Sequence, residues 1–166
     1  MERKKLSASE VRTLYERHGP ALLAYARSFV ADAGLAEDLV QQVFVKLLEG
    51  ETATPEVPGA YLYRAVRNAA LNARRNGLRE SELDPESAWF VHRGGDREAA
   101  LSLQAALREL PEEQREVVMM RVWSGMTLEE IAATTGAPLN TVASRYRYAL
   151  EKLRHRLKPE GRLEER

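Results

Sequence analysis

The sequence predicts an all-α protein with two small helical domains joined by a flexible acidic linker, and with a helix-turn-helix in the C-terminal domain. Apolar residues recur at offsets of three and four along most of the 166 residues, which is the period of an amphipathic helix. Glycine and proline residues separate these segments at helix-length intervals. Six acids gather between Glu80 and Glu98, so we place the domains at residues 1–79 and 99–166 and the linker at 80–98.

The N-terminal domain begins with two predicted helices. The first spans residues 9–30, and its Gly19-Pro20 pair predicts a kink or a short break, because proline removes a backbone hydrogen bond inside a helix. The second spans residues 35–48 and ends at Gly50, since glycine readily adopts the left-handed conformation that stops a helix. Three polar residues of this helix lie off its apolar stripe, where they either meet solvent or form a partner-binding face: Asp38, Gln41 and Gln42.

A third helix is predicted at residues 60–76, and it is strongly basic. No acid occurs between Val57 and Arg79. Arginines neutralise phosphates, asparagines hydrogen-bond to base edges, and Tyr61 and Tyr63 could stack on unpaired bases. The candidate DNA-binding residues are Tyr61, Arg64, Arg67, Asn68, Asn72, Arg74 and Arg75. Taken alone, this pattern fits a solvated helix face with core tyrosines better than a nucleic-acid site.

The acidic linker contains an apolar triplet, Trp89-Phe90-Val91. A segment of about twenty residues without regular structure is uncommon inside one compact unit, which favours a connection between two domains. We expect the triplet to anchor the linker on a neighbouring domain, and a partner-binding motif is the second interpretation.

The C-terminal domain begins with two predicted helices, at residues 99–110 and 111–125, and a helix-turn-helix follows. Thr127 starts a capping-box pattern, Gly136 ends the first helix of the motif, and Pro138 suits the first turn of the second. An ordinary helical hairpin is the competing interpretation. The turn residues and the charge bias of the last helix together favour the helix-turn-helix.

The last predicted helix, from Pro138 to Lys158, has one apolar face and one basic face. Its apolar residues keep helical spacing: Val142, Tyr146, Ala149, Leu150, Leu153 and Leu157. The segment carries six Lys or Arg against one acid, Glu151, and a cationic helix with short polar residues at its front suits a DNA major groove. The candidate DNA-binding residues are Asn140, Thr141, Ser144, Arg145, Arg147, Tyr148 and Lys152.

Position along this helix divides the candidates into two groups, because the N-terminal turns enter the groove deepest. We expect contacts to base edges or their flanking phosphates from Asn140, Ser144, Arg145 and Tyr148. We expect contacts to the strand backbones from Arg147, Lys152 and Arg154.

The composition excludes several functional classes. Apolar residues make up 44% of the chain and no apolar run approaches the roughly 18 residues of a membrane span, so we expect no membrane insertion and a cytoplasmic location. The chain has no cysteine and its three histidines lie in separate segments, so we expect no metal and no cofactor. It contains no phosphate loop, dinucleotide-binding glycine motif or nucleophile elbow, so an enzyme is not expected. The net charge is zero, so only local charge segregation can indicate nucleic acid.

Three segments, in this order and spacing, resemble bacterial sigma factors of the sigma-70 family, specifically the small two-domain extracytoplasmic-function (ECF) group. AEDLVQQVFVKLL is similar to a helix of the family's second domain, and AYLYRAVRNAALNARR is similar to the promoter-melting helix that follows it. The segment from Leu107 to Arg154 looks like the C-terminal domain. The chain departs from the usual pattern at Gln42, Tyr61, Ala143 and Tyr148, where many members carry Glu, Trp, and Lys or Arg.

The resemblance implies a factor that binds core RNA polymerase and directs it to specific promoters for transcription initiation. Asp38, Gln41 and Gln42 would contact core polymerase. The basic third helix would hold the opened single strand at minus-10, and the helix-turn-helix would bind duplex promoter DNA at minus-35. An anti-sigma factor is a further candidate partner, and the polymerase-bound chain would be associated with the nucleoid.

Two other functional classes stay open at this stage. A helix-turn-helix transcriptional regulator with an α-helical sensor domain would act without docking on core polymerase. A helical adaptor that binds only protein would leave both basic helices unexplained. A regulator binds duplex DNA without polymerase and an adaptor binds no DNA, so promoter-dependent transcription with core polymerase separates the three classes.

Overall fold

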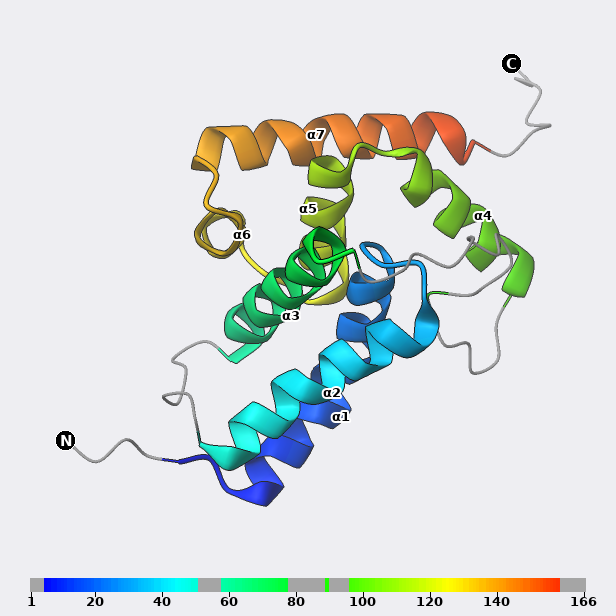
Figure 1. The fold of residues 1–166 in the computed structure, drawn as a ribbon. Coiled ribbons are helices and arrows are strands. Elements are labelled where there is room, and N and C mark those ends of the chain that lie inside the picture. Colours follow the sequence, from blue (N-terminus) through cyan, green and yellow to red (C-terminus); the bar gives the residue numbers. More distant parts are fainter. Residues whose placement is uncertain (1–4, 51–57, 78–88, 90–95, 159–166) are drawn as a thin grey trace, which may run out of the picture.

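The computed structural model describes residues 5–50, 58–77, 89 and 96–158, and every regular element in this part of the chain is an α-helix (Figure 1). The predicted all-α fold class is therefore confirmed. In chain order the helices are α1 (Ala8–Arg27), α2 (Ala33–Glu49), α3 (Pro58–Arg75), α4 (Arg97–Glu109), α5 (Glu112–Trp123), α6 (Leu128–Thr135) and α7 (Leu139–Arg156).

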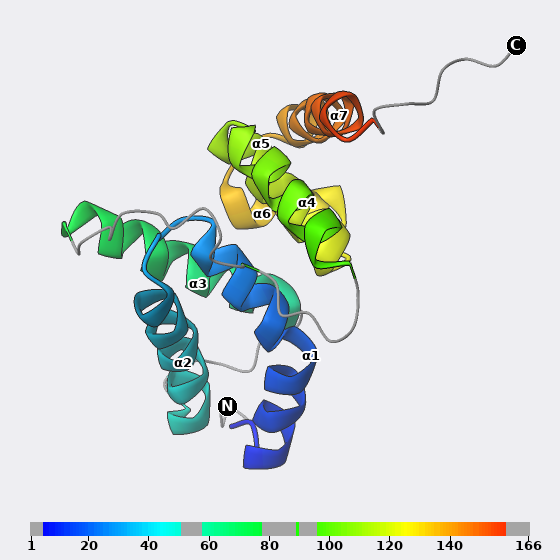
Figure 2. The same cartoon turned by 90° about the vertical axis from the view of Figure 1, so that its right-hand side faces the viewer.

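The helices form two halves that pack against each other. In the N-terminal half, α1, α2 and α3 all contact one another, and in the C-terminal half α5, α6 and α7 do the same, with α4 touching α7. The halves meet where α3 contacts α6 and α1 contacts α5 (Figures 1 and 2). Their buried apolar residues form one continuous cluster, so the described halves share a core.

Local capping explains where several helices begin. Ser7 accepts a hydrogen bond from the backbone N–H of Glu10 at 3.2 Å, and the Glu10 carboxylate accepts one from the N–H of Ser7 at 2.8 Å, which completes a capping box before α1. Asp32 caps α2 through the N–H of Leu35, at 3.0 Å. Asp96 caps α4, so Arg97 and Glu98, which we expected in the linker, form the first turn of a helix.

The Gly19-Pro20 pair, where we expected a kink or a short break, does not interrupt the first helix. α1 runs as one helix from Ala8 to Arg27 with Pro20 inside it. A proline inside a helix costs about 3 kcal/mol or more. The completely buried side chains of Leu22 and Tyr25 follow it on the same helix, and burying two large side chains contributes about 1.5–3 kcal/mol each, which offsets that cost.

The helix α5 lies at the centre of the molecule. Its residues Glu116, Val117, Val118, Met119 and Met120 are all buried, so all sides of this turn are covered. α7 and α6 contact α5 within the C-terminal half, and α1 contacts it from the N-terminal half. A helix that is buried all round belongs in a core. α5 therefore contacts helices of both halves.

Candidate nucleic-acid interface

The predicted helix-turn-helix is formed by α6 and α7. Thr127 caps α6 by accepting a hydrogen bond from the N–H of Glu130, with 3.1 Å between nitrogen and Oγ1. Gly136 has a φ of +72°, which side-chain-bearing residues rarely adopt, and its N–H donates to the carbonyl of Ala132 at 2.9 Å. Pro138 is the N-cap of α7. Thr127 and Gly136 thus cap the two ends of α6, as predicted, and Pro138 directly precedes the first turn of α7.

The apolar stripe of α7 holds the helix on the C-terminal core over most of its length. Val142, Ala149 and Leu153 are buried, as predicted. Tyr146 is half-buried against the same core. Leu157 was expected on this buried stripe, and the structure corrects this, because Leu157 lies past the last residue of α7 and 40% of its surface is exposed.

The candidate DNA-binding residues of α7 differ in their exposure. The exposed ones are Asn140, Arg147, Tyr148 and Lys152, and the half-buried ones are Thr141, Ser144 and Arg145. The Arg147 guanidinium carbon lies 5.1 Å from the centroid of the Tyr148 ring. Arg147 and Tyr148 therefore project together, while Arg145 lies at the border between the outer side and the core.

The basic helix α3 divides its candidate residues between two faces. Four of them line a groove beside α2: Tyr61, Asn68, Asn72 and Arg75. Arg67 and Arg74 instead face α5, and Arg64 is exposed. Tyr63, which we considered as a stacking residue, is completely buried and its ring centroid lies 5.0 Å from that of Tyr25, so it belongs to the core.

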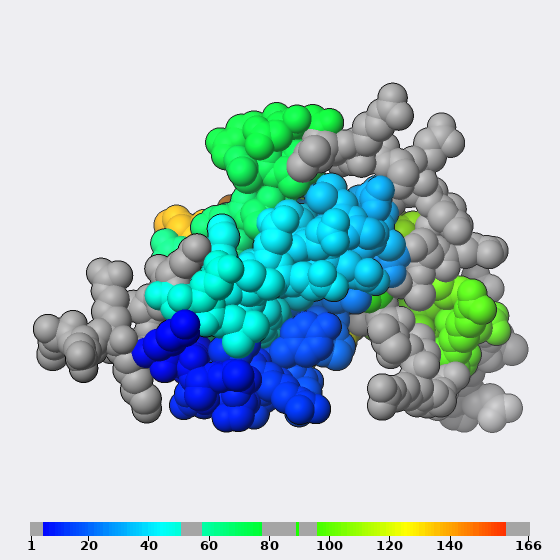
Figure 3. All heavy atoms as spheres, turned by 60° about the horizontal axis from the view of Figure 1, so that its bottom comes forward, coloured from blue at the N-terminus to red at the C-terminus, as the bar shows by residue number. Residues whose placement is uncertain are grey.

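The groove between α2 and α3 has a volume of about 690 Å³. Asp38 and Gln42 line its α2 side, opposite the α3 residues, so two of the three predicted polymerase-contacting residues share this groove with the DNA candidates. Gln41 lies on a different groove, between α1 and α2. Figure 3 shows α2, in cyan, exposed between α1 and α3 on one face of the molecule.

Two ion pairs join α3 to α5 across the two halves. The Nε of Arg67 donates to both carboxylate oxygens of Glu116, at 3.2 and 3.3 Å. Both terminal nitrogens of Arg74 donate to the carboxylate of Glu112, and Nη2 reaches Oε1 at 3.3 Å. Burial raises the pKa of Glu116 above its usual range, and the facing Arg67 opposes this shift. The Glu116 carboxylate is thus a buried charge that depends on an arginine of the other half.

The contacts of both acids across the two halves were not predicted. Neither Glu112 nor Glu116 was among the candidate residues selected from the sequence. Their spacing of four residues matches one face of α5, and Arg67 and Arg74 share one face of α3. That spacing could have suggested an acidic face on α5 and a basic face on α3. Only the packing of α3 against the C-terminal half brings the two faces together.

Trp89 is buried at the junction of the two halves. Its backbone N–H donates to Oε1 of Gln104 in α4 at 2.7 Å. The guanidinium carbons of Arg108 and Arg115 lie 5.2 and 5.9 Å from its ring centroid. Trp89 therefore anchors this part of the chain, as the sequence predicted, whereas Phe90 and Val91 lie outside the described residues.

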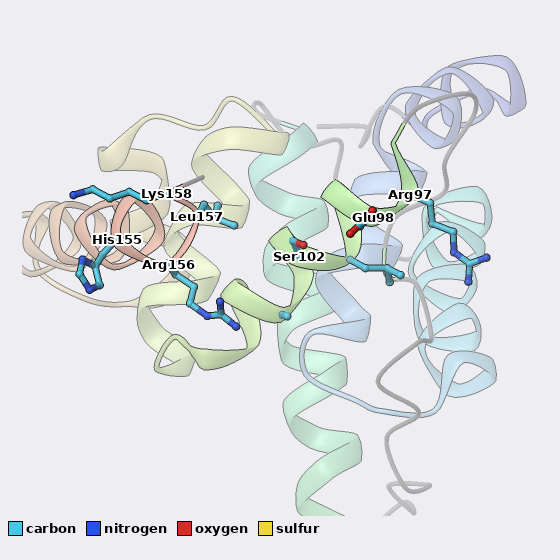
Figure 4. A pocket seen from close by; sticks show the side chains of 9 residues that line it. Arg97, Glu98, Ser102, His155, Arg156, Leu157 and Lys158 are labelled. Carbon is cyan, nitrogen blue, oxygen red and sulfur yellow. The ribbon is translucent and has the colours of Figure 1, made fainter. Parts of the chain in front are cut away.

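A cavity of about 1060 Å³ contains none of the predicted site residues. It lies between α4 and the end of α7, where Figure 4 shows Arg97, Glu98 and Ser102 on one side and His155, Arg156 and Lys158 on the other. Arg156 also pairs with Glu109 at 3.0 Å. Within the described ranges, no group of three or more His, Asp or Glu residues could hold a metal ion. Among the helices described, none has the length and apolar character needed to cross a membrane.

The chain matches two protein-family models, one described as Sigma-70 region 2 over residues 14–80 and one described as Sigma-70, region 4 over residues 100–153. It is similar to the ECF RNA polymerase sigma factor SigL of Mycobacterium tuberculosis, with 31% identity over 168 residues, 93% of this chain and 92% of that protein. It is 29% identical over 163 residues to the RNA polymerase sigma factor SigV of Bacillus subtilis, which covers 96% of this chain and 98% of SigV.

The fold is similar to that of a solved structure, the sigma factor RpoE in complex with the anti-sigma factor NepR from Bartonella quintana. The two superimpose with a TM-score of 0.69 and 25% sequence identity, over 93% of this chain and 100% of that one. The first matched family region spans α2 and α3, and the second spans α5, α6 and most of α7. Each region therefore covers one of the two basic helices.

Proposed function

Because the chain belongs to the extracytoplasmic-function (ECF) sigma factors of the sigma-70 family, we propose that it binds core RNA polymerase and directs it to specific promoters for transcription initiation. Sigma factors are initiation factors rather than enzymes. Family membership does not favour the alternative of a regulator that acts without core polymerase. The observation that carries the proposal is the α2–α3 groove, in which Asp38 and Gln42 face the α3 residues Tyr61, Asn68 and Asn72.

The proposed contact with core polymerase is the exposed polar side of α2. Asp38, Gln41 and Gln42 are all exposed, while the apolar residues Leu39 and Phe44 of the same helix are buried and hold it on the core. α2 contacts both α1 and α3, and Figure 3 shows it exposed between them, so the polar residues project from a supported helix. This division lets a partner bind α2 without disturbing the fold.

The proposed site for the opened strand at minus-10 is the α3 side of the groove. Tyr61 offers an aromatic ring to stack on a base, Asn68 and Asn72 offer amide donors and acceptors, and Arg75 offers a charge to a phosphate. Asn72 already accepts a hydrogen bond from Nη2 of Arg75 at 2.9 Å, which orients both side chains along α3. A single strand in this groove would lie beside the polymerase-contacting residues.

The proposed contact with the minus-35 duplex is the outer side of α7. The side chains at its front are Asn140, Ser144 and Tyr148, and its later turns carry exposed Lys152 and Arg154. Polar groups at the front and cations behind suit a recognition helix whose N-terminal turns enter the major groove. In this function the chain acts in the cytoplasm and joins the nucleoid with polymerase, and an anti-sigma factor is a proposed partner.

Polymerase docking gives the first test. We expect Asp38→Arg to weaken binding to core polymerase about tenfold or more, because it inverts an exposed charge inside the proposed contact. The free energy of unfolding should change by no more than about 0.5 kcal/mol, as is usual for surface substitutions. Titration of fluorescently labelled protein with core polymerase measures the first quantity, and thermal unfolding measures the second.

Glu49→Arg is the matched control, because Glu49 is an exposed acid at the end of the same helix and lies outside the groove. It should leave polymerase affinity nearly unchanged. The docking assignment fails if Asp38→Arg binds core polymerase as tightly as the unmodified chain, or if both substitutions weaken binding equally.

A further inference from the structure

Four arginines surround a small cavity beside Trp89. The cavity has a volume of about 260 Å³, and the helices α1, α3, α4 and α5 each contribute one arginine to its lining: Arg27, Arg74, Arg108 and Arg115. Among the described residues, Glu112 is the only acid in this lining. Four positive charges therefore face one negative charge around the cavity.

The one carboxylate in the lining is shared by two of the arginines. Both terminal nitrogens of Arg74 donate to Glu112, and Nη2 of Arg115 lies 3.8 Å from the same carboxylate. Glu116 also acts on Arg115, but it lies outside the lining and is already paired with Arg67. One shared carboxylate cannot balance both of these cations.

The positive charges around the cavity repel one another. Burial lowers the pKa of Arg27, Glu37 opposes this shift, and Arg108 adds to it. Burial is also the largest cause of the lowered pKa of Arg115, which Arg74 and Arg108 lower further. Guanidinium groups stay protonated in proteins, so this repulsion is present in the folded chain. An anion inside the cavity would relieve it, because opposite charges attract strongly at short range.

Arg108 has a hydrogen-bond donor that the described fold does not use. Its guanidinium carbon lies 5.2 Å from the centroid of the Trp89 ring, and a contact of this kind consumes no N–H donor. Its Nε is buried and has no hydrogen-bond partner in the part of the chain that the structure describes. A buried donor without a partner is costly, and an anion oxygen beside it would supply the missing acceptor.

The volume of the cavity limits the size of the ligand. A water molecule takes about 30 Å³ of the liquid, so the cavity corresponds to roughly nine waters. This is enough for one or two linked phosphate groups, and it is below the roughly 300–1,000 Å³ of pockets that enclose drug-sized ligands. Arg74 and Glu112 are each 34% exposed, so the cavity meets solvent on their side.

We propose that this cavity is a binding site for a small phosphate-bearing anion, held by the guanidinium groups of Arg27, Arg108 and Arg115. Guanidinium groups bind phosphate oxygens through two parallel N–H bonds. The cavity also lies beside the first turn of α5, where the positive end of the helix dipole favours an anion. These three arginines are not among the DNA candidates, so the inference goes beyond the proposed promoter function and does not depend on it.

Fluorescence titration of the full chain with inorganic pyrophosphate tests the site. The chain has two tryptophans, so Trp123→Phe leaves Trp89 as the only one. We expect a saturable change in Trp89 emission, because Arg108 and Arg115 lie over this ring. Calorimetry should give one pyrophosphate per chain. Chloride at equal ionic strength should cause no saturable change.

Titration with ADP identifies the source of the phosphate groups, because ADP carries the same two linked phosphates on a nucleoside. If ADP binds more tightly than pyrophosphate, the ligand is a nucleotide whose nucleoside part makes contacts of its own. If pyrophosphate binds at least as tightly as ADP, the ligand is the free anion. Both results support a phosphate site in this cavity.

Matched arginine variants locate the bound anion. Arg108→Gln should weaken pyrophosphate binding about tenfold or more, because it removes a charged donor group. Arg108→Lys keeps the charge but loses the forked donors, so its affinity should lie between the two. Arg97→Gln removes an exposed arginine of the same helix that lies outside this cavity, and it should leave the affinity nearly unchanged. Circular dichroism checks folding, and Arg27→Gln replaces Arg108→Gln if that variant unfolds.

Three results would overturn the proposal. The first is the absence of saturable pyrophosphate binding by the unmodified chain. The second is an equal loss of affinity in Arg108→Gln and Arg97→Gln, because binding would then follow the net charge and not this cavity. The third is calorimetric binding without a change in Trp89 emission, which would place the anion elsewhere on the chain.

Discussion

Replacing Tyr61 by alanine is expected to weaken the hold of the polymerase-bound protein on the opened strand by about 1–3 kcal/mol, the usual cost of removing an aromatic stacking partner for one base. Tyr61 is half-buried and lines the α2–α3 groove beside Asn68, Asn72 and Arg75. This cost corresponds to a loss of roughly 5- to 150-fold in affinity. Binding of the polymerase-bound variant to a fluorescent minus-10 single strand measures it.

The control for this prediction is Tyr61→Phe, which keeps the ring and removes only the hydroxyl. It should retain most of the affinity for the single strand. The alanine variant should also be more defective on duplex promoters than on templates already melted at minus-10, because capture of the strand helps to open the duplex. If alanine and phenylalanine give the same affinity, Tyr61 does not stack on a base.

The second large effect is expected in α7, where removal of Arg145 and removal of Lys152 should change DNA binding in different ways. Removing Arg145 should cost about 1–3 kcal/mol and relax the preference at one base position of the minus-35 element. Removing the exposed Lys152 should weaken binding to all sequences alike and lower the salt slope by about one, because a phosphate contact carries no sequence information. The measurement is binding of polymerase-bound Arg145→Ala and Lys152→Ala to minus-35 variants at several salt concentrations.

The Arg145→Ala variant needs a stability control, because Arg145 lies close to the core. Arg145 is half-buried, and its charge opposes the burial-driven rise in the pKa of Glu116, so its removal could affect the fold as well as DNA contact. Thermal unfolding of Arg145→Ala should therefore accompany the binding series. If the folded variant weakens every minus-35 sequence equally, Arg145 contacts a phosphate, and the base contacts pass to Ser144 and Tyr148.

The sequence was most informative where structure is decided by a few neighbouring residues. Gly50 and Gly136 end α2 and α6 with φ values of +71° and +72°, as predicted, because a left-handed position close to the helix end strongly favours glycine. The buried stripe of α7 was predicted correctly up to Leu153 for a similar reason, because the spacing of apolar residues along one helix decides which of them share a face. The prediction that Leu157 is buried was wrong, because α7 ends at Arg156.

The sequence was least informative about contacts between the halves. The sequence does not show which of the seven candidate residues of α3 lie on which face of the helix. In the fold, Tyr61 and Asn72 line the α2–α3 groove, whereas Arg67 and Arg74 contact α5. Pro20 predicted a kink or a short break from local chemistry, and packing of the residues around it kept α1 continuous. These outcomes depend on which helices meet, and no local pattern carries that information.

The most direct test of the central claim is transcription with core RNA polymerase over a library of duplex promoters, with and without this chain. We expect specific transcripts that depend on both the chain and core polymerase, that share minus-10 and minus-35 elements, and that are lost with Asp38→Arg. Specific binding of the chain alone to duplex DNA, with no transcript gained when core polymerase is added, would contradict it and support an ordinary transcriptional regulator.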